Sequence, residues 1–201
     1  TLAVNLAWEL ANIDKKSSPS VCMVDLDLQF GSLATYLDLQ RRDIVLEMLT
    51  DATTMDPESF KQALVGFQEK VSVFTTPPEV IPLDIVGPEE IGAVLDLATQ
   101  NFDIVIIDMP RTITMWTETV LNRCDLYLTT IELDLRSAQS AMRFIKALRT
   151  EGLPLEKVGR KPRGEDLHPI ARWRQAGDAG RCQWRSASGS RQEEPAAQGN
   201  P

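Results

Sequence analysis

The chain has 201 residues, of which 43% are hydrophobic and 25% are charged, and its formal net charge is −8. This length suffices for one domain with a sizeable core and is too short for two ordinary domains. The sequence has no apolar run of transmembrane length and no leader typical of a signal peptide. Three widely spaced cysteines and one histidine argue against a disulfide framework and a histidine-based metal site, and they fit a reducing cytoplasm.

Hydrophobic spacing predicts helices and strands that alternate along the chain. The expected elements are a helix over residues 1–13, a strand over 21–24, helices over 32–37, 44–49 and 57–67, a strand over 71–74, a helix over 88–100, a strand over 104–107, a helix over 114–122, a strand over 126–131 and a helix over 137–150. Such alternation is typical of βαβ units, so we expect an α/β fold with a mostly parallel sheet and helices on both faces. The first helix has no strand or turn before it, which suggests a fragment whose start has been removed.

The strand over residues 104–107 consists of four consecutive β-branched side chains. A run without alternation predicts burial on both faces of a parallel sheet. Asp108 ends this run, and Pro110 prevents the strand from continuing. Asp108 therefore falls where open α/β sheets bind ligands, although an aspartate that only caps the next helix would give the same pattern.

Two further carboxylates, Asp25 and Asp27, follow the strand over residues 21–24. Because the ends of parallel strands meet at one edge, Asp25, Asp27 and Asp108 are expected to surround one ligand. Carboxylates held this close repel one another unless a cation neutralises them, and Mg²⁺ bound to a nucleotide phosphate is the usual one. A helix that begins at Thr1 would add an anion site, or Thr1 is simply a helix cap.

A phosphoacceptor receiver domain also has an acidic pair after its first strand. Its acceptor aspartate ends the third strand, close behind that pair. Here 81 residues and a whole extra strand separate Asp27 from Asp108, so the receiver interpretation fits poorly.

The composition changes after residue 157. Residues 1–157 hold 13 Lys and Arg against 24 Asp and Glu, a net charge of −11, whereas residues 158–201 hold 8 against 5, a net charge of +3. The second segment is rich in Arg and Gly and poor in aliphatic residues, so we expect a disordered or non-native basic tail there. Translation in a shifted reading frame would explain the abrupt change, and a genuine basic tail is the alternative. The acidic body makes nucleic-acid binding an unfavoured function.

Three segments together resemble the MinD/ParA group of deviant Walker ATPases. They are T-L-A-V-N-L-A at the start, V-D-L-D-L-Q-F-G-S-L after the first strand and D-I-V-I-I-D-M-P around Asp108. The segment F-G-S-L-A-T-Y-L-D-L is most similar to the CpaE/TadZ branch, which belongs to Tad (Flp) pilus assembly. The resemblance covers residues 1–157 and implies a P-loop NTPase-like nucleotide-binding domain, truncated at the P-loop strand.

The resemblance implies a role for each matched residue. Thr1 corresponds to the position after the magnesium-binding hydroxyl of the P-loop, near the α-phosphate. Asp25 and Asp108 correspond to the carboxylates of the magnesium shell, with Asp108 acting through water. Asp27 corresponds to the catalytic carboxylate that orients the attacking water. The family's glycine-rich loop and lysine precede the segment that matches Thr1, so we expect these 201 residues alone neither to bind nor to hydrolyse ATP appreciably.

For the intact parent, the resemblance implies ATP and Mg²⁺ as ligands, a homodimer controlled by nucleotide, and pilus-assembly partners at the inner membrane or cell pole. Its location would be cytoplasmic, and polar or membrane-associated through those partners. Two alternatives stay open: an ATPase-like scaffold that does not hydrolyse ATP, and a ParA-type DNA-segregation ATPase. Arg41 and Arg42 are interpreted as solvated surface residues.

Overall fold

The structure is a computed structural model, and it describes residues 2–14, 17–51 and 56–152. All of these lie in the first of the two units into which the chain divides, Thr1–Gly159. The second unit, Arg160–Pro201, is outside the described residues. The tail predicted over residues 158–201 and the predicted site residue Thr1 are therefore also outside them.

Four strands form one sheet in the order β2-β3-β1-β4. They are β1 (Val21–Asp25), β2 (Leu64–Phe67), β3 (Val71–Phe74) and β4 (Ile104–Asp108). Strand β1 pairs in parallel with both β3 and β4, and β2 pairs antiparallel to β3. The mostly parallel sheet predicted from the sequence is thus confirmed. The ends of β1, β3 and β4 share one side of the sheet, which we call the carboxyl edge.

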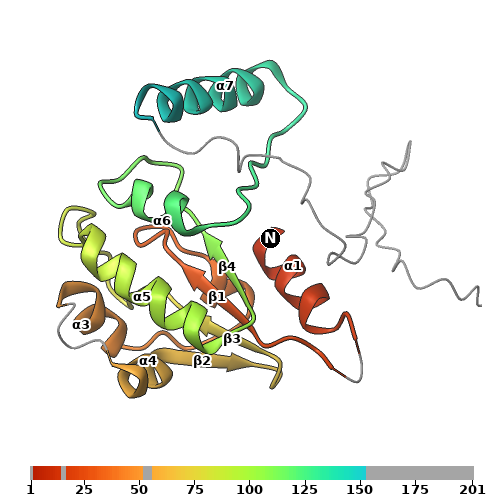
Figure 1. Ribbon diagram of the computed structural model, residues 1–201, viewed down its shortest axis with the longest axis vertical. Coiled ribbons are helices and arrows are strands. Elements are labelled where there is room, and N and C mark those ends of the chain that lie inside the picture. Colours follow the sequence, from red (N-terminus) through yellow and green to blue (C-terminus); the bar gives the residue numbers. More distant parts are fainter. Residues whose placement is uncertain (1, 15–16, 52–55, 153–201) are drawn as a thin grey trace, which may run out of the picture. The chain divides into compact units, whose positions relative to one another are not determined.

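Helices cover both faces of this sheet, as predicted (Figure 1). One face, here called the α5 face, packs against α3 (Ile44–Thr50), α4 (Pro57–Ala63), α5 (Pro88–Asn101) and α6 (Thr117–Arg123). The other, called the α1 face, packs against α1 (Leu2–Ala11) and α2 (Leu33–Tyr36). Side chains along each strand alternate between the two faces. In β1, Cys22 and Val24 join the α5-face core, and Val21 and Met23 join the α1-face core.

Strand β2 corrects the helix predicted over residues 57–67. Helix α4 ends at Ala63, and the chain continues as an antiparallel partner of β3 with Phe67 opposite Val71. Gln68 and Glu69 have φ angles of 47° and 59°, which gives the tight reversal between the two strands. Pairing with β3 and the low helix propensity of Gly66 outweigh the apolar spacing that suggested a longer helix.

Strand β4 corrects a second prediction, because its side chains are half-exposed along its whole length. It is the terminal strand of the sheet, so its outer side has no strand partner among the described residues. The strand predicted over residues 126–131 does not form as an element of this sheet; only Tyr127 makes an isolated bridge. The composition of β4 is typical of a central strand, but β4 lies at an edge of the sheet. The expected burial of β4 on both faces is therefore not seen.

The remaining helices agree approximately with the predicted ranges. Helix α6 begins at Thr117, three residues later than predicted, and α7 runs over Leu135–Thr150. Asp134 caps α7 by accepting a hydrogen bond from the Ser137 backbone N–H at 2.7 Å. Within the part of the chain that the structure describes, none of the helices has the length and apolar character needed to cross a membrane.

Candidate functional site

Asp25 and Asp108 lie side by side at the carboxyl edge. They are the last residues of β1 and β4, and they are partners in the parallel register of these strands. The Leu26 backbone N–H donates to the Asp108 carbonyl oxygen at 2.9 Å, which holds the two strand ends together. Asp27 lies close enough that its charge acts on both Asp25 and Asp108. The structure thus brings three of the four predicted site residues together, and the fourth, Thr1, lies outside the described residues.

The Asp25 carboxylate is fully buried, with a relative exposure of 0%. Its Oδ1 accepts a hydrogen bond from the Asp27 backbone N–H at 3.2 Å, and its Oδ2 accepts one from the Leu33 backbone N–H at 3.1 Å. Burial raises the pKa of Asp25 from 3.8 to about 7, and the charges of Asp108 and Asp27 add to this increase. The two backbone hydrogen bonds oppose it but do not offset it.

Asp108 is half-buried, and burial likewise raises its pKa above the usual value. The positive charge of the amino terminus opposes this increase, and the charge of Asp27 has a smaller effect that adds to it. None of the ion pairs formed by the described side chains reaches Asp25, Asp27 or Asp108. The carboxyl edge therefore concentrates negative charge in a partly desolvated place, where a cation would be stabilised.

The loop from Leu26 to Ser32 wraps around the Asp25 carboxylate. Asp27 opens it with a turn in which the Phe30 backbone N–H donates to both the Asp27 carbonyl at 3.1 Å and its carboxylate at 3.3 Å. At Gly31 the backbone approaches so closely that a Cβ atom would lie 2.7 and 2.8 Å from the two Asp25 oxygens and 2.3 Å from the Thr76 methyl group. Only glycine therefore fits here without displacing its neighbours.

Arg41 fixes this loop from outside. Its Nη2 donates to the Gly31 carbonyl oxygen at 2.8 Å, and the residue is half-buried. The prediction that Arg41 and Arg42 are solvated is therefore wrong for Arg41, whereas Arg42 is exposed. Sequence reasoning also missed Gly31, although a glycine six residues after a buried acid was a usable signal for a close backbone approach.

The amino end of α1 faces the carboxyl edge. Ala11, at the other end of the helix, lines a pocket together with Val21 and Val71, the first residues of β1 and β3. A helix of ten residues spans about 15 Å, which is close to the length of a five-residue strand. Helix α1 therefore runs along the α1 face toward the ends of β1 and β4, where its first backbone N–H groups would favour an anion.

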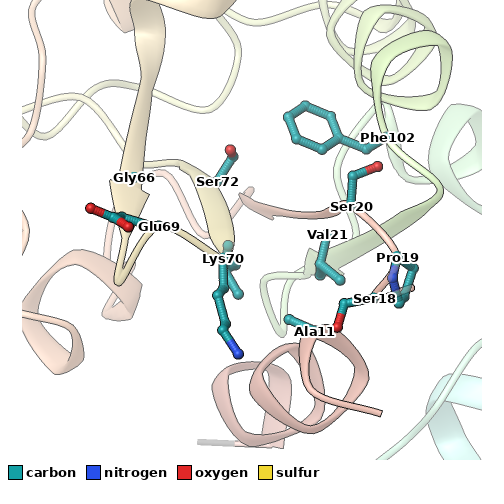
Figure 2. Close-up of a pocket in the computed structure, with 11 residues that line it drawn as sticks. Ala11, Ser18, Pro19, Ser20, Val21, Gly66, Glu69, Lys70, Ser72 and Phe102 are labelled. Atoms are coloured by element: carbon teal, nitrogen blue, oxygen red, sulfur yellow. The ribbon is translucent and has the colours of Figure 1, made fainter. Parts of the chain in front are cut away.

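That pocket, of about 460 Å³, lies at the opposite edge of the sheet from the carboxylates. Figure 2 shows the residues that line it. Phe102, Ser20 and Ser72 line one part of it, and Lys70 lines another. The Lys70 side chain points toward α1, where its ammonium group bonds the Asn12 side-chain oxygen and lies 5.9 Å from the centre of the Trp8 ring. Among the described lining residues, Lys70 is the cationic one, and it is engaged in packing α1. The pocket is separate from the candidate site because it lies at the start of β1 and β3.

The residues at the carboxyl edge fit a hydrated Mg²⁺ better than a metal cage made by protein alone. Among the described residues, no group of three or more His, Cys, Asp or Glu side chains is arranged to hold a metal ion. Mg²⁺ keeps several waters and needs only one or two carboxylates when a phosphate supplies the rest. Asp25 and Asp108, together with a buried Thr75 hydroxyl that has no hydrogen-bond partner among the described residues, match this requirement.

Comparisons with known proteins identify the family that the chain matches. A family model described as "AAA domain" matches residues 1–152. The septum site-determining protein MinD of Thermotoga maritima is 25% identical over 159 residues, which are 79% of this chain and 56% of that protein. The chain therefore spans little more than half the length of this curated relative.

Two solved structures share the fold. A ParA family ATPase from Chlorobium tepidum superposes with a TM-score of 0.67 at 19% identity, covering 78% of this chain and 65% of the other. MinD from Pyrococcus horikoshii, solved in complex with Mg-ADP, superposes with a TM-score of 0.59 at 18% identity, covering 76% and 60%. The likeness extends over most of this chain and under two thirds of either neighbour.

Proposed function

Because the chain belongs to the AAA-domain family of MinD/ParA-type ATPases, we propose that its carboxyl edge is the magnesium end of an ATP site that controls dimerisation. One observation carries this proposal: Asp25 and Asp108 are register partners at the ends of parallel strands, with Asp27 beside them and no ion pair to a described side chain. The Mg-ADP complex of the neighbouring MinD structure supports the same ligand class.

In this proposal each residue has a separate role. Asp25 and Asp108 hold the magnesium shell, Asp108 through water, and Asp27 orients the water that attacks the γ-phosphate. Mg²⁺ supplies neutralisation of the phosphate charge, which is most of what phosphoryl transfer requires. Gly31 and Arg41 shape the loop that carries Asp27, and Thr1 would lie near the α-phosphate.

We propose further that the parent is a CpaE-like protein that localises or assembles the Tad (Flp) pilus machinery at the inner membrane or cell pole. The segment F-G-S-L-A-T-Y-L-D-L, which includes Gly31 and α2, supports this branch. In such a protein the nucleotide acts as a switch for homodimerisation and partner binding. A scaffold that dimerises without hydrolysing ATP would use the same surface.

The test compares the 201-residue chain with a longer parent that includes the segment before Thr1. We expect titration calorimetry to show ATP·Mg binding in the micromolar range for the parent and no appreciable binding for the 201 residues alone, because the family's phosphate-binding loop precedes Thr1. ATP·Mg should convert the parent from monomer to dimer in sedimentation velocity. Asp27→Asn should leave binding intact and abolish phosphate release.

Each outcome has a distinct meaning. Micromolar ATP·Mg binding to the 201-residue chain would refute the predicted inactivity of this chain. A parent that dimerises with ATP but releases no phosphate would be the scaffold. Pilus assembly can be tested in cells whose only copy of the parent protein carries Asp27→Asn or Asp108→Asn. Normal assembly with both variants would exclude a pilus role that depends on this site.

A further inference from the structure

Three buried side-chain polar atoms lack a hydrogen-bond partner among the described residues: two are Arg41 Nε and Trp116 Nε1, and the third directly follows the end of β3. It is the hydroxyl oxygen of Thr75, a residue with a relative exposure of 0%. A buried hydroxyl is destabilising unless something satisfies it, and native structures rarely leave one unpaired. The position of Thr75 indicates what the missing partner is.

Thr75 continues the register that joins β3, β1 and β4. Phe74, the last residue of β3, is the partner of Val24, so the next pair along is Thr75 and Asp25. Asp25 is in turn the partner of Asp108. Register partners in parallel strands point to the same face, so one row of Thr75, Asp25 and Asp108 follows Val73, Met23 and Ile106 on the α1 face.

The neighbouring residue, Thr76, lies close to the Asp25 carboxylate. The Thr76 methyl group and both Asp25 carboxylate oxygens all lie within 2.8 Å of the position that a Cβ atom on Gly31 would take. The segment after β3 therefore borders the Asp25 carboxylate directly. The Thr75 hydroxyl is nevertheless not hydrogen-bonded to that carboxylate, so its hydrogen-bonding capacity is unused among the described residues.

We propose that Thr75 is a positioning residue for a divalent cation at the carboxyl edge, its hydroxyl bonding a water of the cation's hydration shell. This inference rests on the proposed function, because it assumes that Asp25 and Asp108 hold the cation. A threonine hydroxyl can accept a hydrogen bond from such a water and donate its own proton to a carboxylate. Thr75 then fixes the orientation of the shell without being a metal ligand, as outer groups commonly do.

The test uses the 201-residue chain and Mn²⁺ as the probe, with free Mn²⁺ measured by electron paramagnetic resonance. Thr75→Val keeps the shape of the side chain and removes only the hydroxyl. We expect it to weaken Mn²⁺ binding by about tenfold, while the metal-free protein unfolds at the same or a higher urea concentration because an unpaired buried hydroxyl is gone. Thr75→Ser should bind Mn²⁺ nearly as well as the wild type.

Thr117 provides the matched control. It is also buried, with a relative exposure of 2%, but its hydroxyl already accepts a hydrogen bond from the Thr114 backbone N–H at 2.9 Å. Thr117→Val should therefore lower stability and leave Mn²⁺ affinity unchanged. Should Thr75→Val fail to fold, the comparison of Thr75→Ala with Thr75→Ser measures the same hydroxyl.

The outcomes separate this inference from the proposed function. Equal Mn²⁺ affinity for the wild type and Thr75→Val, with reduced affinity for Asp108→Asn, would overturn the role of Thr75 and leave the cation site standing. Equal affinity for the wild type and Asp108→Asn would show that the carboxyl edge of this chain holds no cation in the absence of phosphate, which would overturn the role of Thr75, whereas the proposed function is tested separately by ATP·Mg binding to the parent.

Discussion

At pH 8, the Asp25→Asn variant is expected to be more stable than the wild-type chain by about 2–4 kcal/mol. The wild type must keep a fully buried carboxylate ionised at this pH, whereas its pKa is raised by burial from 3.8 to about 7. A shift of this size corresponds to about 4 kcal/mol. The asparagine variant should lose part of this stabilisation, because its amide nitrogen cannot accept the hydrogen bond that one of the Asp25 oxygens accepts from a backbone N–H.

The sign of this effect depends on pH. Below about pH 4 the carboxyl is neutral in both the folded and the unfolded chain, so its full contribution to stability is present. Between about pH 4 and pH 7 the unfolded chain releases the proton and the folded chain retains it, so stability falls as the pH rises. Above pH 7 the loss is complete. Urea unfolding of the wild type should therefore show a decline over this interval that Asp25→Asn lacks.

Asp103 is the control for this experiment. Its pKa is lowered by hydrogen bonds from the Ser20 hydroxyl and the Ser20 backbone N–H, so its contribution to stability is lost as the pH falls. Asp103→Asn should therefore reduce the loss of stability at acidic pH and leave the decline in stability toward pH 7 unchanged. If the wild type and Asp25→Asn show parallel pH profiles, Asp25 is not the buried acid that the structure places at the carboxyl edge.

Gly31→Ala is expected to destabilise the chain by about 1–3 kcal/mol. The added Cβ atom would lie 2.3 Å from the Thr76 methyl group and 2.7 Å from an Asp25 oxygen, so the loop, the methyl group or the carboxylate must move. Movement of the carboxylate would break its hydrogen bonds with Asp27 and Leu33 and admit water, which would bring the pKa of Asp25 back toward its usual value.

Gly66→Ala is the matched control, because a Cβ atom there meets no other atom within 4 Å. Its free energy of unfolding should stay close to that of the wild type. Both variants can be measured by urea denaturation, and the Asp25 carboxyl can be titrated in each by carbon-13 NMR. Equal stability of the Gly31 and Gly66 variants would mean that the loop does not approach Asp25 as closely as described.

Much of the fold was predictable from local patterns. The runs over residues 21–24 and 104–107 are continuous and apolar, the run over 71–74 is interrupted only by Ser72, and each is a strand of the sheet. The carboxylates that follow the first and last of these runs share one edge because parallel strands end on the same side. Predicting that these carboxylates share an edge requires only the direction of the strands, which the alternation of helices and strands indicates.

Long-range pairing was not predictable in the same way. Residues 64–67 have the apolar spacing of a helix, and only the neighbouring strand β3 makes them β2. The half-exposure of β4 depends on its place in the strand order, which its own composition does not encode. The strand ends pointed to Asp25, Asp27 and Asp108, and the MinD/ParA resemblance gave each of them a role. The contacts of Gly31, Arg41 and Thr75 emerge only from the structure.

The most direct test of the carboxyl edge as a cation site is a carbon-13 NMR titration of the Asp25 carboxyl with and without millimolar Mg²⁺. Without Mg²⁺ its pKa should be about 7. A cation held between Asp25 and Asp108 favours the ionised form, so Mg²⁺ should lower this pKa, and Asp108→Asn should reduce the effect. An Asp25 pKa that Mg²⁺ leaves unchanged would contradict the assignment of this edge as a cation site.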